Sequence, residues 1–519
     1  MKWSLIINSI LIKPDNILDH QKIQIRIFLI FMGGNMSIIE NTKKAYIRMS
    51  APVKASLWFT ICSILQKGIT LLSTPIFTRL LTTEQYGVYS VYQAWYFIIN
   101  IFATLNLYLG VYNNGMTKFP EDRNRFTSSM LGLSTTITMI FFVVYLFGQK
   151  FWTGLFDLSP FYLYAMFIAF LFTSAYNFWS TSQRFDYKYK KLVIITIVMA
   201  IATPVSGIIG VLITEHKAEA RVFTYVLVQS LIGLILYVFI MKKGKCYYSK
   251  EYWKYGLAFN IPLIPHYLST MVLNQSDRIM INNMVGSGEA AIYSVAYQVS
   301  MMMTIITTAI NNSYVPYTFK ELRAKRTEGV RRSSNFLLIL VGCACLLATA
   351  FGPEIIRVFA SKEYYDAIWV IPPVSISVYF MFLYPLFANV EFYFEKTKFV
   401  AIASTLAAIL NLGLNYVFIP IYGYYATGYT TLASYIVYSC AHMYYYKKIM
   451  KREFGKKDLY DLKFIFVFSI FLLISMLLMT IVYKYIVLRY SIILIILIIL
   501  FINRGGFVTQ LSLIRGKQK

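Results

Sequence analysis

The sequence of 519 residues has few charged side chains, and most of those it has are basic. Only 14% of the residues are Asp, Glu, Lys or Arg, against about 25% in an ordinary soluble domain. Hydrophobic residues make up 58% of the chain, which excludes intrinsic disorder. A net charge of +26 can mark a nucleic-acid-binding protein, but such proteins do not have a mean hydropathy of +0.58. The composition therefore indicates a polytopic membrane protein.

Cysteine is also scarce, and no enzyme motif is present. The 5 cysteines offer no pair on the outer side that could form a disulfide framework. Cys343 and Cys345 lie inside an apolar run, where packing explains them better than metal ligation does. The chain contains no P-loop, no GxSxG and no HExxH. These absences give no support to an ATP-driven pump or a hydrolase, and we expect no cofactor and no metal.

Long uncharged runs are abundant. A spanning helix needs about 20 apolar residues. Such runs occur at 55–78 (interrupted by Lys67), 85–117, 126–149, 158–183, 192–214, 222–241, 255–276, 290–319, 333–353, 367–390, 399–441, 464–483 and 490–503. The run 399–441 is long enough for two helices, separated by Pro420-Ile-Tyr-Gly423. The sequence thus predicts an all-α protein with about fourteen transmembrane helices.

The basic residues alternate between the two sides of this predicted bundle. One side receives only Arg79, Lys150, Lys217, Arg221, Arg278, Arg357, Lys362, Lys484 and Arg489. Apart from Lys67, every other basic residue from Lys43 onward falls on the opposite side. Because short cytoplasmic loops are rich in Lys and Arg, we expect that side and both termini to be cytoplasmic. The net charge of +26 is then a topology signal, and we expect no nucleic-acid partner.

The chain divides into four parts. Residues 1–35 resemble neither a spanning helix nor a cleavable signal peptide, so this leader is doubtful and the true start is predicted at Met36. Glu84-x7-Tyr92-Gln93 recurs 205 positions later as Glu289-x7-Tyr297-Gln298. This repeat predicts two parallel six-helix lobes, at residues 36–245 and 246–447, related by a pseudo-two-fold axis along the membrane normal. Residues 448–519 would supply two further helices and a cytoplasmic tail.

Three basic residues are candidates for contact with an anionic substrate. Lys67 falls near the middle of the first span, where a charge is costly and often functional. It is either a cavity cation, for example for a phosphate, or a side chain that snorkels or forms an internal pair. Arg79 and Arg278 fall at matching outer positions of the two lobes. They are either interface caps or two outer cations near the pseudo-two-fold axis.

Other polar residues cluster in the seventh and eighth predicted spans. Pro262 and Pro265 should kink the seventh span and free backbone carbonyls. Asn260 and His266 lie beside them, and His266 is either a proton sensor or a hydrogen-bonded structural residue. Asp277 must find a partner other than its neighbour Arg278, because adjacent helical residues point about 100° apart.

Amide side chains in several spans and a pair of carboxylates complete the polar set. Gln298, Asn100, Asn106, Asn411 and Asn415 each fit helix–helix contacts, and together they fit a hydrated centre. Glu391 and Glu395, at the inner end of the run 367–390, are expected in a solvated loop with local ion pairs.

Several segments, in order, resemble the bacterial polysaccharide repeat-unit flippases of the superfamily that includes the MATE exporters. They are Pro75-Ile-Phe-Thr-Arg79-Leu-Leu-Thr-Thr-Glu84-Gln-Tyr-Gly87, Asp277-Arg278, 351–364 and Asn411-x3-Asn415 through Gly423. The resemblance implies flipping of polyprenyl-pyrophosphate-linked oligosaccharides from the inner to the outer leaflet of the bacterial cytoplasmic membrane, for O-antigen, capsule or exopolysaccharide. Lys67, Arg79 and Arg278 would neutralise the pyrophosphate, and Asp277 or His266 could couple transport to H⁺ or Na⁺.

The resemblance also suggests partners and leaves alternatives open. A polysaccharide polymerase and its chain-length machinery would act with such a flippase, and membrane lipids would surround it. A cation-coupled MATE-type exporter of small molecules uses the same scaffold, but the first lobe lacks the buried carboxylate it would need. A membrane polysaccharide polymerase or ligase would need a large outer loop, and the outer loops here are short.

Overall fold

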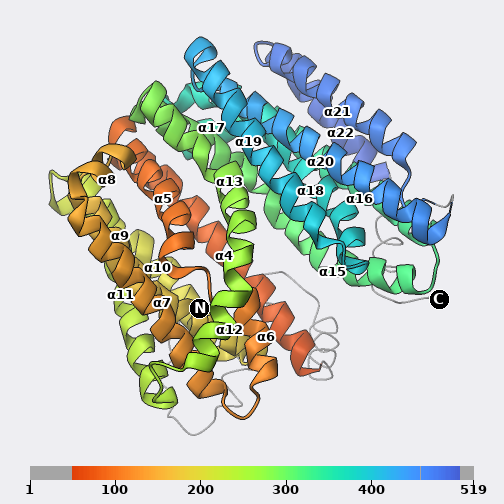
Figure 1. The fold of residues 1–519 in the computed structure, drawn as a ribbon. Helices are drawn as coiled ribbons and strands as arrows, with labels where there is room; N and C mark the ends of the chain where they lie inside the picture. The colour runs from red at the N-terminus through yellow and green to blue at the C-terminus, as the bar shows by residue number, and fades with distance from the viewer. Residues whose placement is uncertain (1–49, 456–457, 503–519) are drawn as a thin grey trace, which may run out of the picture.

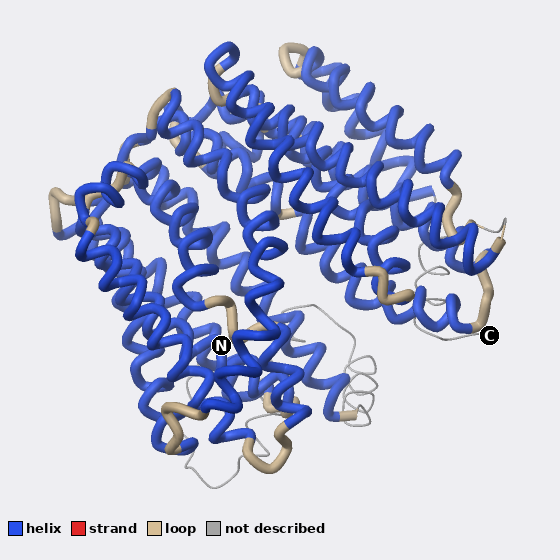
Figure 2. Tube along the Cα trace, in the orientation of Figure 1, coloured by secondary structure: helices blue, strands red, loops and turns tan. Residues whose placement is uncertain are grey.

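A computed structural model describes residues 50–455 and 458–502, and all its regular elements are helices (Figures 1 and 2). The doubtful leader, Met36 and both termini lie outside these described residues. The first helices are α4 (Ala51–Leu80), α5 (Thr83–Thr104), α6 (Gly110–Lys118), α7 (Arg123–Phe147), α8 (Gln149–Phe156), α9 (Pro160–Phe185), α10 (Tyr189–Ile213) and α11 (Lys217–Gly244). We refer to this group as the N-terminal lobe.

The second group begins with a broken helix. Its elements are α12 (Lys250–Asn260), the 3-10 turn η1 (Ile261–Leu263), α13 (Ile264–Met284), α14 (Ser287–Met301), α15 (Met303–Arg323), α16 (Glu328–Ala350), α17 (Gly352–Phe359), η2 (Lys362–Trp369), α18 (Ile371–Tyr393), α19 (Thr397–Tyr422) and α20 (Tyr425–Phe454). We call α13 to α20 the C-terminal lobe. The last pair, α21 (Leu462–Val482) and α22 (Ile486–Ile502), packs on α16 of that lobe.

The helices match the predicted spans closely. Eleven helices of the described residues are long and apolar enough to cross a membrane. The other predicted runs correspond to α5 with α6, to α20 and to the shorter α22. The run 399–441 breaks as expected, because the chain turns at Gly423, whose φ of 63° suits glycine. The prediction of an all-α polytopic membrane protein is therefore confirmed.

Two spans are broken in their interiors. The sequence predicts one helix over the run 85–117, but Leu105 and Asn106 adopt left-handed backbone conformations that separate α5 from α6. No proline or glycine marks this break, which depends on a tertiary contact described below. The prolines at 262 and 265 interrupt the seventh span at η1, as predicted. Beyond that kink α13 packs on α19, whereas α12 packs on α6 and α7 of the N-terminal lobe.

The lobes share one hydrophobic core and keep two separate ones. The shared core contains Phe77 and Tyr92 of the N-terminal lobe together with Tyr293 and Tyr364 of the C-terminal lobe. Away from this core, one cluster around Phe178 lies in the N-terminal lobe with α12, and another around Phe387 lies in the C-terminal lobe with α21. The lobes are therefore packed together at one end only.

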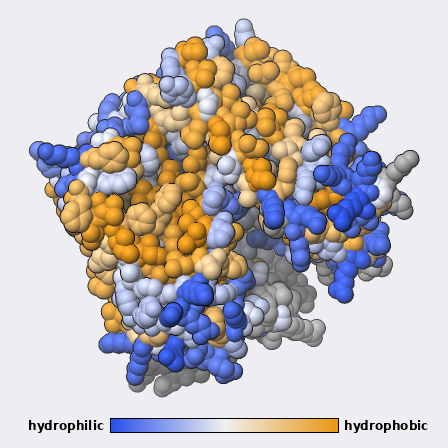
Figure 3. All heavy atoms as spheres, viewed as in Figure 1, coloured by the Kyte–Doolittle hydropathy of each residue, from blue (hydrophilic) through white to orange (hydrophobic). Residues whose placement is uncertain are grey.

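Polar side chains distinguish the two ends of the bundle. Figure 3 shows an apolar band across the middle of the molecule and large hydrophilic patches at the lower ends of both lobes. The helix ends near Lys118, Arg184, Lys243, Arg323 and Lys451 carry many of the predicted cytoplasmic basic residues. We call this end the basic end. The opposite end, which carries Arg79, α8, α17 and the shared core, is called the far end.

Candidate functional site

A cavity of about 500 Å³ lies between the two lobes toward the basic end. One wall is the first span, α4, which contributes Ser56, Thr60, Ser63 and Lys67. These residues are four, three and four positions apart, so they form one polar stripe along the helix. The opposite wall is α15, with Thr308 and Asn312, and the end of α9 completes the cavity with Arg184 and Tyr187.

Lys67 supplies the ammonium group of this cavity. Its side chain is exposed, and its Nζ lies 3.5 Å from Thr304 Oγ1 on α15 of the other lobe. Within the described residues no salt bridge joins Lys67 to a carboxylate. The cavity therefore presents a cation whose only recorded polar contact is a neutral hydroxyl, which leaves its charge available for an anion.

Arg184 is a second cation of the cavity, and sequence reasoning assigned it only to a basic loop. It lies in the last turn of α9, and its guanidinium carbon is 5.8 Å from the centre of the Phe59 ring on α4. Its position in the sequence does not predict this place, because the end of α9 reaches the cleft only when the next helix, α10, packs on α4.

Arg79 does not join Lys67. Its guanidinium donates hydrogen bonds to the carbonyls of Pro75, at 2.7 Å, and of Val358 on α17, at 3.1 Å. Beside it, Thr78 donates to the Phe359 carbonyl, and Ser361 donates back to the Thr78 carbonyl. Arg79 thus ties the far end of α4 to the C-terminal lobe.

Gln298 links the lobes in the same region. Its side-chain carbonyl accepts a hydrogen bond from Thr74 Oγ1 at 3.1 Å, and its amide donates to the Tyr86 hydroxyl at 3.0 Å. Next to this contact, Gly87 packs so closely on α14 that a Cβ there would lie 1.8 Å from the Ser287 carbonyl oxygen. The helices α5 and α14, which carry the two copies of the predicted sequence repeat, therefore meet directly at the far end.

Asp277 lies at the centre of a buried polar network in the C-terminal lobe. Its side chain is 1% exposed and accepts hydrogen bonds from the Tyr293 hydroxyl, Asn415 Nδ2 at 2.7 Å and Thr431 Oγ1 at 2.9 Å. Asn411 extends the network through Asn415. The partners of Asp277 lie on three other helices, and their hydroxyl and amide groups are all neutral donors to its carboxylate.

Arg278 lies next to Asp277 in the chain but contacts other residues. Its guanidinium donates to Ser294 Oγ at 3.1 Å and Gln275 Oε1 at 2.7 Å, and it lies 4.6 Å from the centre of the Tyr297 ring. It is 8% exposed and therefore buried within the C-terminal lobe. Neither Arg278 nor Arg79 lines the cavity that contains Lys67.

The kink of the seventh span contacts the break in the second. Asn260, fully buried before Pro262, donates its side-chain amide to the carbonyl of Leu105, one of the two left-handed residues. This hydrogen bond satisfies a carbonyl that a continuous helix would have used internally. After the kink, His266 Nδ1 lies 3.3 Å from Ser404 Oγ on α19. The two irregular segments are thus coupled by a side chain.

The structure corrects the expectation for Glu391. It lies in α18 with no exposed surface, and one of its carboxylate oxygens is 2.7 Å from Nδ1 of the equally buried His442 on α20. Glu395 is exposed, as expected. Sequence spacing suggested a solvated pair, but α18 extends beyond the uncharged run and carries Glu391 into the lobe. His442 is not among the residues that the sequence predicts for a site.

Two models of known protein families match this chain. The model for the polysaccharide biosynthesis protein family matches residues 53–321, more than half of the chain, and the MatE model matches residues 262–417. Two Haemophilus influenzae proteins, "Lsg locus putative protein 1" and an uncharacterized membrane protein, are each 24% identical to it over 205 and 202 residues. These alignments cover 37% and 38% of this chain, which spans about half the length of each relative.

Solved structures share the fold at low sequence identity. The lipid II flippase MurJ in an inward closed conformation is 14% identical with a TM-score of 0.65, covering 87% of this chain and 100% of that one. An inward-facing MATE transporter of the MOP superfamily is 11% identical with a TM-score of 0.57, covering 78% and 100%. A MOP superfamily transporter from Pyrococcus furiosus is 13% identical with a TM-score of 0.54, covering 78% and 97%. The chain belongs to the polysaccharide biosynthesis protein family and has the fold of MurJ and the MATE transporters.

Proposed function

We propose that this protein flips polyprenyl-pyrophosphate-linked oligosaccharides across the bacterial cytoplasmic membrane for surface polysaccharide synthesis. The observation that carries the proposal is the cleft between two lobes that holds Lys67 and Arg184 and has no carboxylate among its lining residues. A sugar head and a pyrophosphate cannot cross hydrocarbon unassisted, because their polar groups would lose water without replacement. A polar cleft replaces that water while the lipid tail stays in the bilayer.

The difference between the two ends of the molecule suggests the direction in which the substrate crosses the membrane. In this proposal the basic end is cytoplasmic, so the cleft opens toward the side where lipid-linked sugars would be loaded. Lys67 and Arg184 bind the pyrophosphate, while Arg79 and Gln298 hold the far end closed. Opening of that far-end closure and closing of the basic end would move the site between faces, as in other transporters built from repeats.

Arg278 has a supporting role in this proposal rather than a direct one. It fixes α13 to α14 through Ser294 and Tyr297, the helix pair that meets the N-terminal lobe. Asp277 is the group we assign to coupling with H⁺ or Na⁺, because it is the carboxylate held by three neutral donors in the same lobe. A polymerase and its chain-length machinery would consume the flipped product on the outer side.

A MATE-type exporter is the second candidate, since the MatE model also matches and Asp277 is a buried carboxylate. Deletion of the gene in its own host separates the two. If the chain is the flippase, surface polysaccharide falls and lipid-linked repeat units accumulate on the inner leaflet, and plasmid-borne wild-type protein restores both. Unchanged surface polysaccharide, with loss of efflux of cationic dyes, would overturn the flippase assignment in favour of the exporter.

A further inference from the structure

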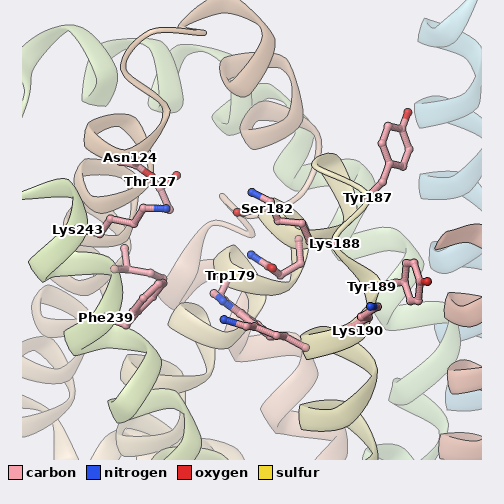
Figure 4. Close-up of a pocket in the computed structure, with 13 residues that line it drawn as sticks. Asn124, Thr127, Trp179, Ser182, Tyr187, Lys188, Tyr189, Lys190, Phe239 and Lys243 are labelled. Carbon is pink, nitrogen blue, oxygen red and sulfur yellow. The ribbon is translucent and has the colours of Figure 1, made fainter. Parts of the chain in front are cut away.

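A second cavity, of about 510 Å³, lies outside the cleft and entirely within the N-terminal lobe. It is formed at the basic end by the first turns of α7 and α10 and the last turns of α9 and α11 (Figure 4). No residue of the C-terminal lobe lines it. It shares Tyr187 with the cleft but none of the polar residues of α4 and α15 that line the cleft, so a separate ligand can occupy it.

The cavity is strongly cationic. Lys188, Lys190, Lys191 and Lys243 line it, and Figure 4 shows Lys188 and Lys243 reaching toward its centre from opposite sides. Lys188 is neutralised by Asp186, at 2.7 Å. Among the described residues, no salt bridge engages the other three lysines. Three uncompensated ammonium groups around one cavity favour an anion.

The same cavity has an apolar wall. Trp179, 6% exposed, forms its floor, and Phe239 and Ile240 line it from α11. Phe239 is 51% exposed and lies one helical turn before Lys243, whose Nζ is 6.0 Å from the centre of its ring. The opening therefore joins the apolar surface of the spanning helices to the lysines at their ends. That depth in a membrane is the level of the lipid headgroups.

We propose that this cavity binds an anionic phospholipid of the leaflet at the basic end. The headgroup phosphate contacts Lys190, Lys191 and Lys243, and an acyl chain runs along Phe239. Basic pockets between transmembrane helices are suited to such headgroups. A free phosphate would satisfy the lysines but would leave the apolar wall unused. The bound lipid would join α7, α9, α10 and α11 at their ends and so stiffen the lobe that carries Arg184.

The test uses the full chain in detergent micelles, with native mass spectrometry to count retained lipids. Phosphatidylglycerol should be retained in preference to phosphatidylcholine. The triple variant Lys190→Gln, Lys191→Gln, Lys243→Gln should lower the affinity for phosphatidylglycerol at least about tenfold, roughly the loss of one charge-assisted hydrogen bond. The matching triple Lys→Arg variant, which keeps the charges, should bind as the wild type does and so shows that the lobe is folded.

Two controls make the result decisive. Lys447→Gln, Lys448→Gln, Lys451→Gln removes the same charge from exposed positions at the end of α20 and should leave binding unchanged. Phe239→Ala should weaken the lipid but not inorganic phosphate. The proposal is overturned if the α20 variant loses lipid equally, because the attraction is then a general surface effect. It is also overturned if inorganic phosphate or glycerol phosphate binds as tightly as the phospholipid.

Discussion

His442 and Glu391 form a hydrogen-bonded pair with no exposed surface, joining α20 to α18 at 2.7 Å. The rings of Tyr384 and Tyr438 pack against the imidazole, at 5.7 and 4.7 Å between ring centres. Within the described residues, the other carboxylate oxygen and the imidazole Nε2 have no hydrogen-bond partner. The pair therefore depends on a single contact to compensate two buried polar groups.

Replacing one partner of this pair should destabilise the folded protein more than replacing both. Glu391→Met should lower the free energy of unfolding by about 3–5 kcal/mol, because it leaves a buried imidazole uncompensated. The double variant Glu391→Met, His442→Phe should lose much less, since well-packed apolar groups replace both. Thermal unfolding of the purified variants in micelles measures this. Additive losses in the double variant would show that the two side chains do not act as a pair.

Asp461 gives a pH-dependent contact outside the spans. Its carboxylate caps α21 by accepting a hydrogen bond from the Phe464 backbone N–H at 3.1 Å, and it pairs with Arg331 at 3.0 Å. The Phe464 N–H, with a further contribution from Arg331, lowers the pKa of Asp461 below its usual value. A lowered folded-state pKa means that the stabilisation is present above the unfolded pKa of about 3.9 and is lost as pH falls through the folded pKa.

Two substitutions separate the cap from the charge. Asp461→Ala should cost about 1 kcal/mol at neutral pH through loss of the cap. Asp461→Asn keeps a capping oxygen and should cost about 0.5 kcal/mol or less, because Arg331 is half exposed. The gap between wild type and Asp461→Asn should close below about pH 4 in thermal melts recorded as a function of pH. A gap that is constant with pH would contradict a role for the ionised carboxylate.

Composition and loop charge sufficed to predict the helical architecture. The runs of apolar residues gave the spans because each of these helices must satisfy its own backbone inside a bilayer. The break after Thr104 is not predicted from the sequence, because a single Asn following Leu105 in a long apolar run is a weak turn signal. The break leaves the Leu105 carbonyl without a partner in its own helix, and the side-chain amide of Asn260, on another helix, donates a hydrogen bond to it. Local sequence cannot show a contact between residues 155 positions apart.

The candidate site was predicted in part. Lys67 stood out because a lone charge in an apolar run is rare, and the structure places it in the cleft. Arg79, equally conspicuous in sequence, binds backbone carbonyls at the far end instead. Arg184 was hidden among the other basic residues of its loop, since charge alone does not reveal which loop residue turns toward a cleft. Glu391 was misassigned because its helix continues past the apolar run.

Gly87 provides a test of the far-end closure. Gly87→Leu should force α5 away from the Ser287 carbonyl, because a Cβ at this position already overlaps that oxygen. Overpacking of this kind costs about 1–3 kcal/mol, and here it should shift the protein toward a state open at the far end. In a background without cysteines, Thr78→Cys is buried at this closure and should react slowly with an impermeant thiol reagent.

The reaction of Thr78→Cys should accelerate when Gly87→Leu is added. Gly413→Leu is the matched control, because nothing lies within 4 Å of a Cβ at that position. Equal thiol reaction rates in the two glycine variants would mean that α5 and α14 do not hold the far end closed.

Asp277 should carry any coupling to an ion gradient. Asp277→Asn keeps the size of the side chain and an acceptor for Tyr293 and Thr431, but it removes the negative charge. We expect flipping in proteoliposomes to continue and to lose its response to an imposed Na⁺ or pH gradient. His266→Asn, which alters a half-buried residue whose side chain bonds to Ser404, should retain that response. If Asp277→Asn still follows the gradient, the coupling group lies elsewhere.

Lys67 is the strongest test of the cleft. Lys67→Met keeps an unbranched side chain one atom shorter and removes the charge, so the pyrophosphate would lose one charge-assisted hydrogen bond worth about 1.5–3 kcal/mol. That corresponds to a loss of affinity of about tenfold to a hundredfold.

Lys67→Arg should restore most of this affinity, and Lys150→Met, at an exposed position of α8, should have no effect. Binding of a polyprenyl pyrophosphate to the purified protein measures this directly. Because Lys67 is exposed and, within the part of the chain that the structure describes, its side chain bonds to Thr304 alone, its replacement should not unfold the protein. A stable Lys67→Met variant with wild-type affinity would therefore remove this residue from the mechanism and leave Arg184 as the cation to test next.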